Sequence, residues 1–372
     1  MNIGIIAFGA YDTRKPRVRL MLAAIRRAGA LDGAIHIRGW ENVAESNVPS
    51  KGSFMKVLAR MLIAYPGALW RLMRSKKGAA ILLPYPGIVE IFLIAPLARM
   101  MRRKVILDAF LPIYDTIVMD RELARPGGLV AGAIHLFEKL ALHRADIIVV
   151  DTDIHADYFA TEFGIPAERF QTVLVGAEDG FSPDAALEDV QDILPADEGK
   201  AIVLFYGQLI PLHGLPTILE AAKLYTGVPA RWVIIGKGQL EPLMHEATAS
   251  GAIEWIEWVD YERLPAVIAH ADLCLGVFGA SDKAARVIPN KLFQQLAVGK
   301  PVITRESRAV DALATRHPNT VMTVPANDPQ TLANAVAQAL ADAGALEPLP
   351  HASLGELTPD TGIGQLIERL KR

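Results

Sequence analysis

The sequence predicts an α/β protein built from two doubly wound domains, each with a parallel sheet between helices. Three observations lead to this prediction. Short apolar runs alternate with segments of helical periodicity. The alternation stops at a polar, acidic stretch over residues 181–200 and then starts again. The chain has 372 residues, of which 51% are hydrophobic, so it can bury two cores of ordinary domain size.

In the first half, apolar runs predict strands and longer amphipathic segments predict helices. The expected strands are Asn2–Phe8, Ala80–Leu83, Val105–Asp108, Ile147–Val150 and Thr172–Val175. The expected helices are Val18–Ala28, Phe54–Met73, Val89–Met101 and Val130–His143. Short strands separated by such helices are typical of βαβ units, so a mostly parallel sheet is expected.

The second half repeats this rhythm. Its expected strands are Ala201–Tyr206, Arg231–Ile235, Ile253–Trp255, Leu273–Gly276, Pro301–Thr304 and Thr320–Val324. Its expected helices are Leu215–Tyr225, Gln239–Ala249, Leu264–His270, Asn290–Ala297 and Asp328–Asp342. The chain closes with a helical segment at Thr358–Lys371.

These elements define the expected domains. We predict a first domain over residues 1–182, a second over 183–352, and a C-terminal segment over 353–372 that returns to the first domain. Ligands of doubly wound sheets bind at the C-terminal ends of the strands, so the site is expected in a cleft where the domains face each other.

Composition excludes several classes of protein. The one cysteine, Cys274, excludes a disulfide scaffold and any Cys-rich zinc or iron–sulfur site. The start of the chain lacks the pattern of a secretory signal. The most apolar long stretch, Ile81–Met101, contains three prolines and Glu90, which favours buried elements over a membrane span.

Charge is unevenly distributed along the chain. Residues 1–105 hold 18 Lys and Arg against 5 Asp and Glu, whereas the remainder holds 20 against 36. This asymmetry predicts a polyanionic partner for the first third, such as a membrane surface or an anionic acceptor. Solvated basic helix faces are the alternative explanation.

The loop Tyr206–Gly214 follows a predicted strand and precedes a predicted helix, an arrangement that suits a phosphate. Gly207 would allow a ligand to approach the backbone, and a protonated His213 could donate to a phosphate oxygen. Gly236 and Gly238 flank Lys237 after the next strand and form half of a dinucleotide fingerprint. An ordinary strand–helix loop and a tight turn are the alternatives for these two segments.

The segment from Phe278 to Gln294 is the densest in candidate residues. A Gly-containing loop at Gly279 leads to a helix. Three cations, Lys283, Arg286 and Lys291, and the amide Asn290 lie close to the start of that helix in the sequence. Cations at a helix N-terminus oppose the helix dipole unless an anion lies between them and the free N–H groups. The segment therefore predicts an anion site, with a solvated basic turn as the alternative.

In the first half, Asp108 ends a predicted strand and is followed by Tyr114 and Asp115. A carboxylate there can act as a base or bind hydroxyl groups, or it can simply cap a loop. Asp151 and Asp153 precede a helix start and are interpreted as capping residues rather than metal ligands. No metal-binding histidine spacing, Walker A motif or G-x-S-x-G elbow occurs.

Taken together, these blocks resemble the family-4 glycosyltransferases of the GT-B fold, over most of the chain. The segments that carry the resemblance are YGQLIPLHG (206–214), VIIGKG (233–238), ADLCLGVFGASDKAARVIPNKLFQQLAVGKPVIT (271–304), DAFLPIYDTIVMDR (108–121), ADIIVVDTDIHADYFATEFG (145–164) and the final helix. The resemblance implies two Rossmann-like domains, with the nucleotide-sugar donor on the C-terminal one and the acceptor on the N-terminal one. It also implies retention of anomeric configuration, no bound metal and no cofactor.

The chain departs from the common family pattern. Gln208 and His213 stand where many members have Arg and Lys, and Arg286 and Gln294 stand where many have two Glu residues. We therefore expect the positive charge to have moved to Lys283, Arg286 and Lys291. Gln294 can still hydrogen-bond a ribose hydroxyl.

The resemblance also implies roles for residues of the first domain. Asp108 is expected to contact the transferred sugar or the acceptor hydroxyl, and counts with Lys283 and Arg286 as a predicted catalytic residue. The predicted acceptor-binding residues are Tyr11, Arg14, Arg17, Tyr114 and Asp115. The predicted donor-binding residues are Gly207, Gln208, His213, Gly236, Gly238, Phe278, Gly279, Asn290, Lys291 and Gln294.

The leading prediction is a retaining, metal-independent glycosyltransferase acting on a lipid-linked or surface-glycan acceptor. The alternatives are a nucleotide-sugar epimerase and a degenerate, non-catalytic partner protein. A nucleic-acid partner is not expected. The basic, apolar segment Phe54–Met73 could lie in an anionic bilayer interface, so a cytoplasmic protein at the inner face of the plasma membrane is expected. A buried helix with snorkelling cations is the alternative for this segment.

Overall fold

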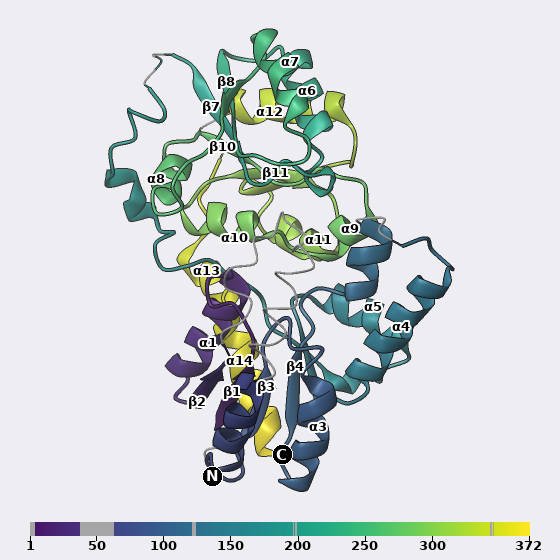
Figure 1. Ribbon diagram of the computed structural model, residues 1–372. Coiled ribbons are helices and arrows are strands. Elements are labelled where there is room, and N and C mark those ends of the chain that lie inside the picture. Colours follow the sequence, from purple (N-terminus) through teal and green to yellow (C-terminus); the bar gives the residue numbers. More distant parts are fainter. Residues whose placement is uncertain are drawn as a thin grey trace. The chain divides into compact units, whose positions relative to one another are not determined.

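The computed structural model describes residues 4–37, 63–120, 124–195, 197, 199–342, 344 and 346–372, except the side chains of Met119, Asp120, Lys283 and His351. The chain divides into two compact units (Figure 1). Unit 1 consists of residues 1–175 and 359–372, and unit 2 of residues 176–358. These limits differ by a few residues from the predicted ones at 182 and 352.

Unit 1 is built on a six-stranded sheet in the order β2-β1-β3-β4-β5-β6, and all neighbouring strands are parallel. Its strands are β1 (Ile5–Gly9), β2 (Leu31–His36), β3 (Ala80–Leu83), β4 (Val105–Asp108), β5 (Ile147–Val150) and β6 (Phe170–Thr172). Its helices are α1 (Pro16–Arg27), α3 (Ile91–Met100), α4 (Leu129–Leu142), α5 (Asp153–Phe163) and α14 (Pro359–Lys371), with a π-helical turn η1 (Asp115–Asp120).

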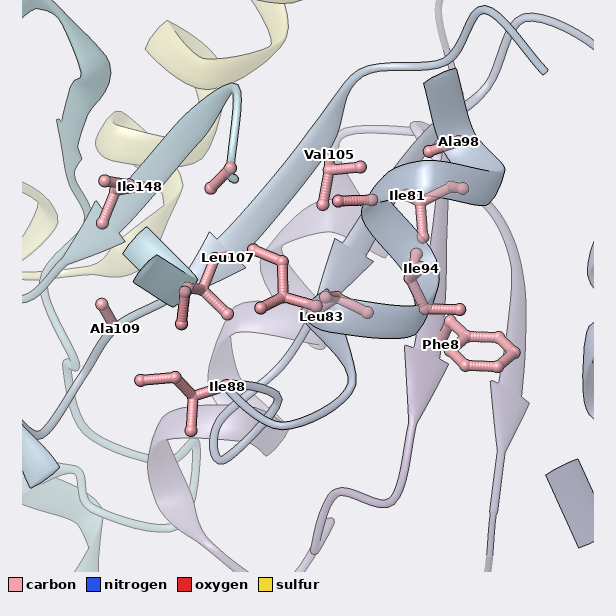
Figure 2. Packing of buried hydrophobic residues seen from close by; sticks show 14 of the residues in the cluster. Phe8, Ile81, Leu83, Ile88, Ile94, Ala98, Val105, Leu107, Ala109 and Ile148 are labelled. Atoms are coloured by element: carbon pink, nitrogen blue, oxygen red, sulfur yellow. The ribbon is translucent and has the colours of Figure 1, made fainter. Parts of the chain in front are cut away.

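Helices cover both faces of this sheet because the strands are apolar on both sides. On one face, Phe8, Leu83 and Leu107 pack with residues of α3, α4 and α5, and Figure 2 shows Ile94 and Ala98 of α3 in this cluster. On the other face, β-strand residues pack with α1 and α14. The final helix α14 therefore belongs to unit 1 and packs beside α1. Arg27 of α1 forms an ion pair with Asp360 of α14 at 2.7 Å.

Unit 2 repeats the plan with the strand order β12-β11-β10-β7-β8-β9, again all parallel. Its strands are β7 (Ala201–Tyr206), β8 (Ala230–Ile235), β9 (Glu254–Ile256), β10 (Leu273–Leu275), β11 (Val302–Arg305) and β12 (Val321–Val324). Its longer helices are α6 (Leu215–Leu224), α7 (Pro242–Ala249), α10 (Asn290–Ala297), α11 (Arg308–Arg316) and α12 (Pro329–Ala341). Its shorter helices are α8 (Leu264–Ala269), α9 (Asp282–Arg286), α13 (His351–Glu356), η3 (Pro183–Leu187) and η4 (Pro211–His213). Unit 1 has one further short helix, η2 (Ala167–Arg169).

The predicted fold class is confirmed, and several elements differ from the prediction, including the short helices α9 and α13, which were not predicted. The edge strand β2 was not predicted, because its LDGAIH sequence buries only Ile35 and lacks a continuous apolar run. The strand expected at Thr172–Val175 ends at Thr172 instead. Helix α11 was not predicted either. The part of the expected helix Phe54–Met73 before residue 63 lies outside the described residues.

Candidate functional site

The strand order of unit 2 reverses between β7 and β10, and a crevice at such a point is where doubly wound sheets bind ligands. The loops after these two strands are packed backbone against backbone. The N–H of Phe278 donates to the carbonyl of His213 at 3.0 Å. A β-carbon on Gly279 would lie 2.4 Å from the carbonyl oxygen of Leu212. Gly279 therefore serves the close approach of the two loops, and Phe278 is fully buried in the core of the unit.

Lys291, in the first turn of α10, is the most informative residue of the site. Its side chain is 93% buried, and within the described part of the chain its ammonium nitrogen has no hydrogen-bond partner. The nitrogen lies 3.9 Å from the centre of the Phe205 ring and 3.1 Å from where a β-carbon on Gly207 would stand. Burial lowers the pKa of this ammonium well below its ordinary value. An anion beside Gly207 would supply the missing counter-charge.

His213 adjoins this ammonium, on the turn η4. Its Nδ1 is hydrogen-bonded to the carbonyl of Gln208, and a β-carbon on Gly207 would lie 3.5 Å from its ring. Burial and the neighbouring Lys291 lower the pKa of His213 to about 3. The ring is therefore neutral in the free protein, so the predicted protonated donor would require an anion to bind first. Gln208 itself is exposed.

Gln294, one turn after Lys291 on α10, is engaged at both ends of its amide. Tyr206 donates to its oxygen at 3.0 Å, and its nitrogen donates to the hydroxyl of Tyr261 at 2.8 Å. Tyr261 in turn donates to Glu178 at 2.8 Å, and the Gln294 nitrogen lies 3.4 Å from the second oxygen of that carboxylate. Position 294 thus contacts a carboxylate that comes from the start of the unit, 116 residues earlier.

The turn Gly236–Gly238 is set against the neighbouring loop. A β-carbon on Gly236 would lie 1.9 Å from the carbonyl oxygen of Gly207, and one on Gly238 would lie 2.7 Å from that of Leu209. Lys237 is exposed and pairs with Glu257 at 2.7 Å. Close packing against the neighbouring loop therefore explains both glycines, in agreement with the tight-turn alternative. Their contact with the donor stays a prediction.

The remaining predicted donor residues lie around the start of α10. Asn290 is its first residue, and no side chain among the described residues caps the helix, so its first N–H groups face outward from the helix end. Arg286 is half-buried at the end of α9, which packs beside η4. The side chain of Lys283 lies outside the described residues. The structure places the Lys291 ammonium beside the Gly207 loop.

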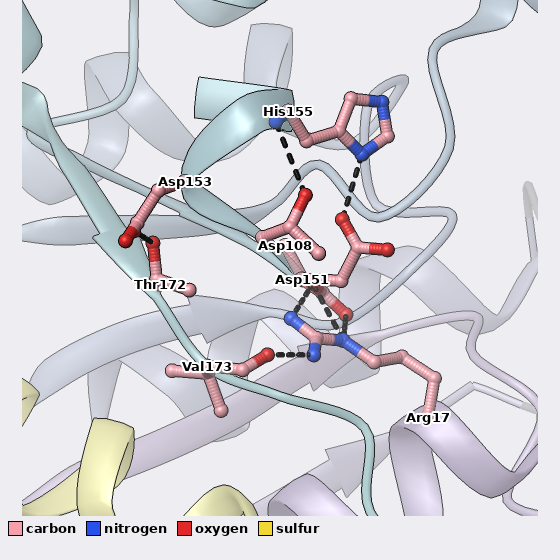
Figure 3. A network of polar contacts seen from close by, with 8 residues as sticks. Arg17, Asp108, Asp151, Asp153, His155, Thr172 and Val173 are labelled. Atoms are coloured by element: carbon pink, nitrogen blue, oxygen red, sulfur yellow. Dashed lines mark hydrogen bonds and ion pairs between the residues drawn. The ribbon is translucent and has the colours of Figure 1, made fainter. Parts of the chain in front are cut away.

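In unit 1, Asp108 and Arg17 bind each other. The Arg17 guanidinium contacts the Asp108 carboxylate at 2.9 Å, and both side chains are at most 2% exposed (Figure 3). Arg17 also donates to the carbonyl of Val173 and lies over the ring of Phe110 at 5.3 Å. The pair joins α1 to the end of β4. In this arrangement each charge neutralises the other. The predicted roles, Arg17 at the acceptor and Asp108 at the transferred sugar or the acceptor hydroxyl, stay predictions.

The other predicted acceptor residues are held separately. Tyr11 is buried against His36, with ring centres 4.7 Å apart, and its burial raises its pKa. Arg14 is exposed and pairs with Asp12 at 2.8 Å. Asp115 begins the η1 turn, and Tyr114 directly precedes it, with its N–H donating to Glu138 at 2.8 Å.

Glu138 is a buried carboxylate of α4 that no motif in the sequence marked as a candidate. Both of its oxygens accept backbone N–H groups, from Ile113 and Tyr114 at 2.8 Å each. Burial, with smaller contributions from Asp115 and Glu162, raises its pKa to about 7. Its role in the fold is to hold the segment that follows β4.

The interpretation of Asp151 as a capping residue is wrong in detail. The cap of α5 is Thr152, whose hydroxyl accepts from the N–H of His155, while Asp151 binds His155 Nδ1 at 2.7 Å (Figure 3). Within the described residues, no group of three or more His, Cys, Asp or Glu is arranged to hold a metal ion. No helix in the described ranges is long and apolar enough to span a bilayer.

Comparison with known proteins supports the resemblance. Residues 200–342 match the profile of the family described as Glycosyl transferases group 1. WcaI of Escherichia coli (strain K12), whose name assigns it to colanic acid biosynthesis as a glycosyl transferase, is 28% identical over 198 residues, or 49% of this chain and 46% of its own. The match thus spans about half the length of that relative.

Solved structures match over the whole chain. HepE of Anabaena in complex with UDP aligns with a TM-score of 0.68 at 12% identity, covering 100% of both chains. Sucrose-phosphate synthase of Thermosynechococcus elongatus aligns with a TM-score of 0.71 at 15% identity, covering 99% of both. The predicted fold, two Rossmann-like units of the GT-B type, and the predicted resemblance to glycosyltransferases are confirmed.

Proposed function

We propose that this protein is a glycosyltransferase that moves a sugar from a nucleotide-diphosphate sugar to a lipid-linked or surface-glycan acceptor, retaining the anomeric configuration and using no bound metal. Unit 2 would bind the donor and unit 1 the acceptor. The protein would act in the cytoplasm, at the inner face of the plasma membrane.

One observation carries the donor half of this proposal: the buried ammonium of Lys291, which has no partner in the described structure and is aimed at the Gly207 loop. A protein keeps a buried, unpaired charge at a cost to stability, so a ligand of opposite charge is the simplest reason for it. The site lies at the reversal point of the sheet, beside an uncapped helix start that favours anions. The HepE structures named as complexes with UDP and with UDP-glucose support a diphosphate of this class.

The same groups suit the departure of the diphosphate. When the bond from the sugar to the diphosphate breaks, negative charge grows on the leaving oxygen. The Lys291 ammonium, the N–H groups at the start of α10 and the predicted cation Arg286 would stabilise that charge without a metal ion. Removal of one such group from a pre-organised site typically costs 10²–10³-fold in turnover.

Glu178, Tyr261 and Gln294 provide hydroxyl-binding groups next to this site. The Glu178 carboxylate accepts from the hydroxyl of Tyr261 and lies at hydrogen-bond reach of position 294. We assign it the ribose or sugar hydroxyls of the donor, in combination with Gln294. The sequence did not indicate this residue, because it lies far from the α10 motif along the chain.

The proposal is tested with a panel of radiolabelled nucleotide-diphosphate sugars and membrane extract as the acceptor source. We expect sugar transfer from one donor class, unaffected by EDTA, and lost in Arg286→Ala and in Lys291→Met. Proton NMR of the product should show the anomeric configuration of the donor. Interconversion of the donor without an acceptor would show an epimerase instead, and the absence of any nucleotide binding would show a non-catalytic protein.

A further inference from the structure

Helix α4 of unit 1 presents apolar side chains to solvent. Leu129 is 95% exposed, Val130 64%, Leu136 55% and Leu140 42%. Its one carboxylate, Glu138, is turned inward and buried. A surface helix of a globular unit normally has the opposite pattern, with its apolar stripe inside and its charges outside.

The exposed face surrounds an open apolar hollow of about 410 Å³. The hollow is lined by Ile113, Leu129, Val130, Ala133, Ile134 and Phe137. These are side chains of α4 and of the segment after β4, so the hollow belongs to unit 1 alone.

The neighbouring helix α3 extends this surface. Phe92 of α3 stacks on Phe137 of α4, with ring centres 5.1 Å apart. Leu93 in the first turn of α3 is 45% exposed, and Val89, just before the helix begins, is 64% exposed. Several large apolar side chains thus lie exposed on two adjacent helices, which in a soluble unit marks an interaction surface.

The charges at the border of this surface are positive. Between residues 124 and 144 the cations are Arg125, Lys139 and Arg144, and Glu138 is the one acidic residue. The guanidinium of Arg144 lies over the ring of Phe92 at 4.6 Å. Glu162 of the adjoining helix α5 is engaged by His135 at 2.9 Å.

We propose that the apolar face of α4, with its extension on α3, seats unit 1 in the interface of a bilayer that contains anionic phospholipid. Apolar side chains bordered by Lys and Arg are what such an interface binds, through buried apolar area and attraction to the headgroups. A twofold contact between two copies through this face would place like cations of the two copies close together, which disfavours a dimer. The 18 basic residues among the first 105 give the same chain further attraction to the anionic surface.

The test is co-sedimentation of the full chain with vesicles of phosphatidylcholine, with and without 30% phosphatidylglycerol. We expect binding to the anionic vesicles that weakens with added salt. The double variant Leu129→Ser, Leu136→Ser should bind at least tenfold more weakly. Both residues are exposed, so its melting temperature should stay within about 2 °C of the parent. The matched control is Leu187→Ser in η3 of unit 2, where the leucine is 87% exposed, and it should bind like the parent.

Equal vesicle binding by the double variant and the parent would overturn the proposal. A parent dimer in analytical ultracentrifugation that becomes a monomer in the double variant would also overturn it, since a second copy would then cover the face. Hydrolysis of the sugar nucleotide in water, measured without vesicles, should be the same in the double variant and the parent. If neither the parent nor the double variant hydrolyses the sugar nucleotide, that result would count against the proposed function. It would not affect the proposal that this face binds lipid.

Discussion

Replacement of Lys291 by methionine should raise the stability of unit 2 and abolish donor binding at the same time. Lys291 is 93% buried and its side-chain nitrogen has no hydrogen-bond partner in the described structure, so removal of this polar group removes a desolvation cost. Methionine has a similar length and no charge, so it can fill the same space against Phe205. A residue retained for folding alone would not show opposite effects on stability and binding.

The magnitudes follow from the surroundings of the ammonium. An unpaired buried polar group costs about 1–3 kcal/mol, and the Phe205 ring at 3.9 Å returns about 0.5–2 kcal/mol as a cation–π contact. Taking the middle of both ranges, we expect Lys291→Met to raise the free energy of unfolding by about 1 kcal/mol, or the melting temperature of unit 2 by about 2–4 °C. Loss of a buried charge pair with the diphosphate should weaken binding by about 2–5 kcal/mol, which is about 30-fold to several thousandfold in Kd.

The assays are differential scanning calorimetry and isothermal titration calorimetry with UDP. Titrations in two buffers of different ionisation enthalpy should also show proton uptake by the parent. Burial lowers the pKa of Lys291 and an arriving diphosphate raises it again, so the site gains protons at any pH between the two values. The other titratable groups facing this ammonium are His213 and Tyr206, and His213 has its pKa lowered in the free protein and can take up protons in the same way. Lys291→Arg, which keeps the charge, should remain less stable than Lys291→Met.

A Kd for UDP within threefold of the parent in Lys291→Met would refute the reasoning. So would a variant that has lost more than about 1 kcal/mol of stability, because the ammonium would then be a structural group with a partner.

Three further predictions concern the rest of the fold. Arg17→Met should destabilise unit 1 by about 3–5 kcal/mol, because Asp108 would be left as a buried, unpaired charge; thermal melting monitored by circular dichroism measures this loss. The ¹³C signal of the Glu138 carboxyl should titrate near pH 7, and since the folded pKa is raised above the unfolded value of 4.5, this residue's contribution to stability should decline by about 3 kcal/mol as pH rises from about 4.5 to 7. Gly279→Ala should lower the melting temperature of unit 2, because its methyl group would lie 2.4 Å from the carbonyl oxygen of Leu212.

Each of these has its own control. The double variant Arg17→Met, Asp108→Leu should recover most of the loss, and no recovery would show that Arg17 acts through its other contacts. A Glu138 midpoint below 5 would contradict the argument from burial. Gly132→Ala on α4 is the control for Gly279→Ala, since a β-carbon there meets no atom within 4 Å. Equal melting temperatures for Gly279→Ala and the parent would show that the two loops are not packed as described.

The buried strands and the helix that bears the site could be predicted from the sequence. The predicted limits Ala80–Leu83, Val105–Asp108, Ile147–Val150 and Ala201–Tyr206 are those of β3, β4, β5 and β7, and Asn290–Ala297 is α10. Central strands of a parallel sheet are buried on both faces and therefore appear as continuous apolar runs. Edge strand β2 is exposed along much of its length, so its residues carry no such signal.

The candidate site was predicted in part. The loop after β7 and the start of α10 were selected from their glycines and cations, and the structure brings Gly207, His213 and Lys291 together. Glu178 could not be selected, because its place beside Gln294 depends on a contact over 116 residues. Arg17 and Asp108 were both selected for chemistry. Their pairing with each other, across 91 residues of sequence, also could not be predicted from motifs or residue spacing.

The sequence by itself determined the class of fold, the repeat of two αβ halves and the resemblance to glycosyltransferases, because these depend on local periodicity and on short contiguous motifs. The tertiary structure decided which charges are paired. It neutralised Arg17 and Asp108 with each other, left Lys291 buried without a partner in the described chain, and turned the apolar side of α4 outward. Which charges pair and which side chains are buried depends on which segments, distant in the sequence, come into contact. Those contacts form only when the helices pack on the sheets and the cores are complete.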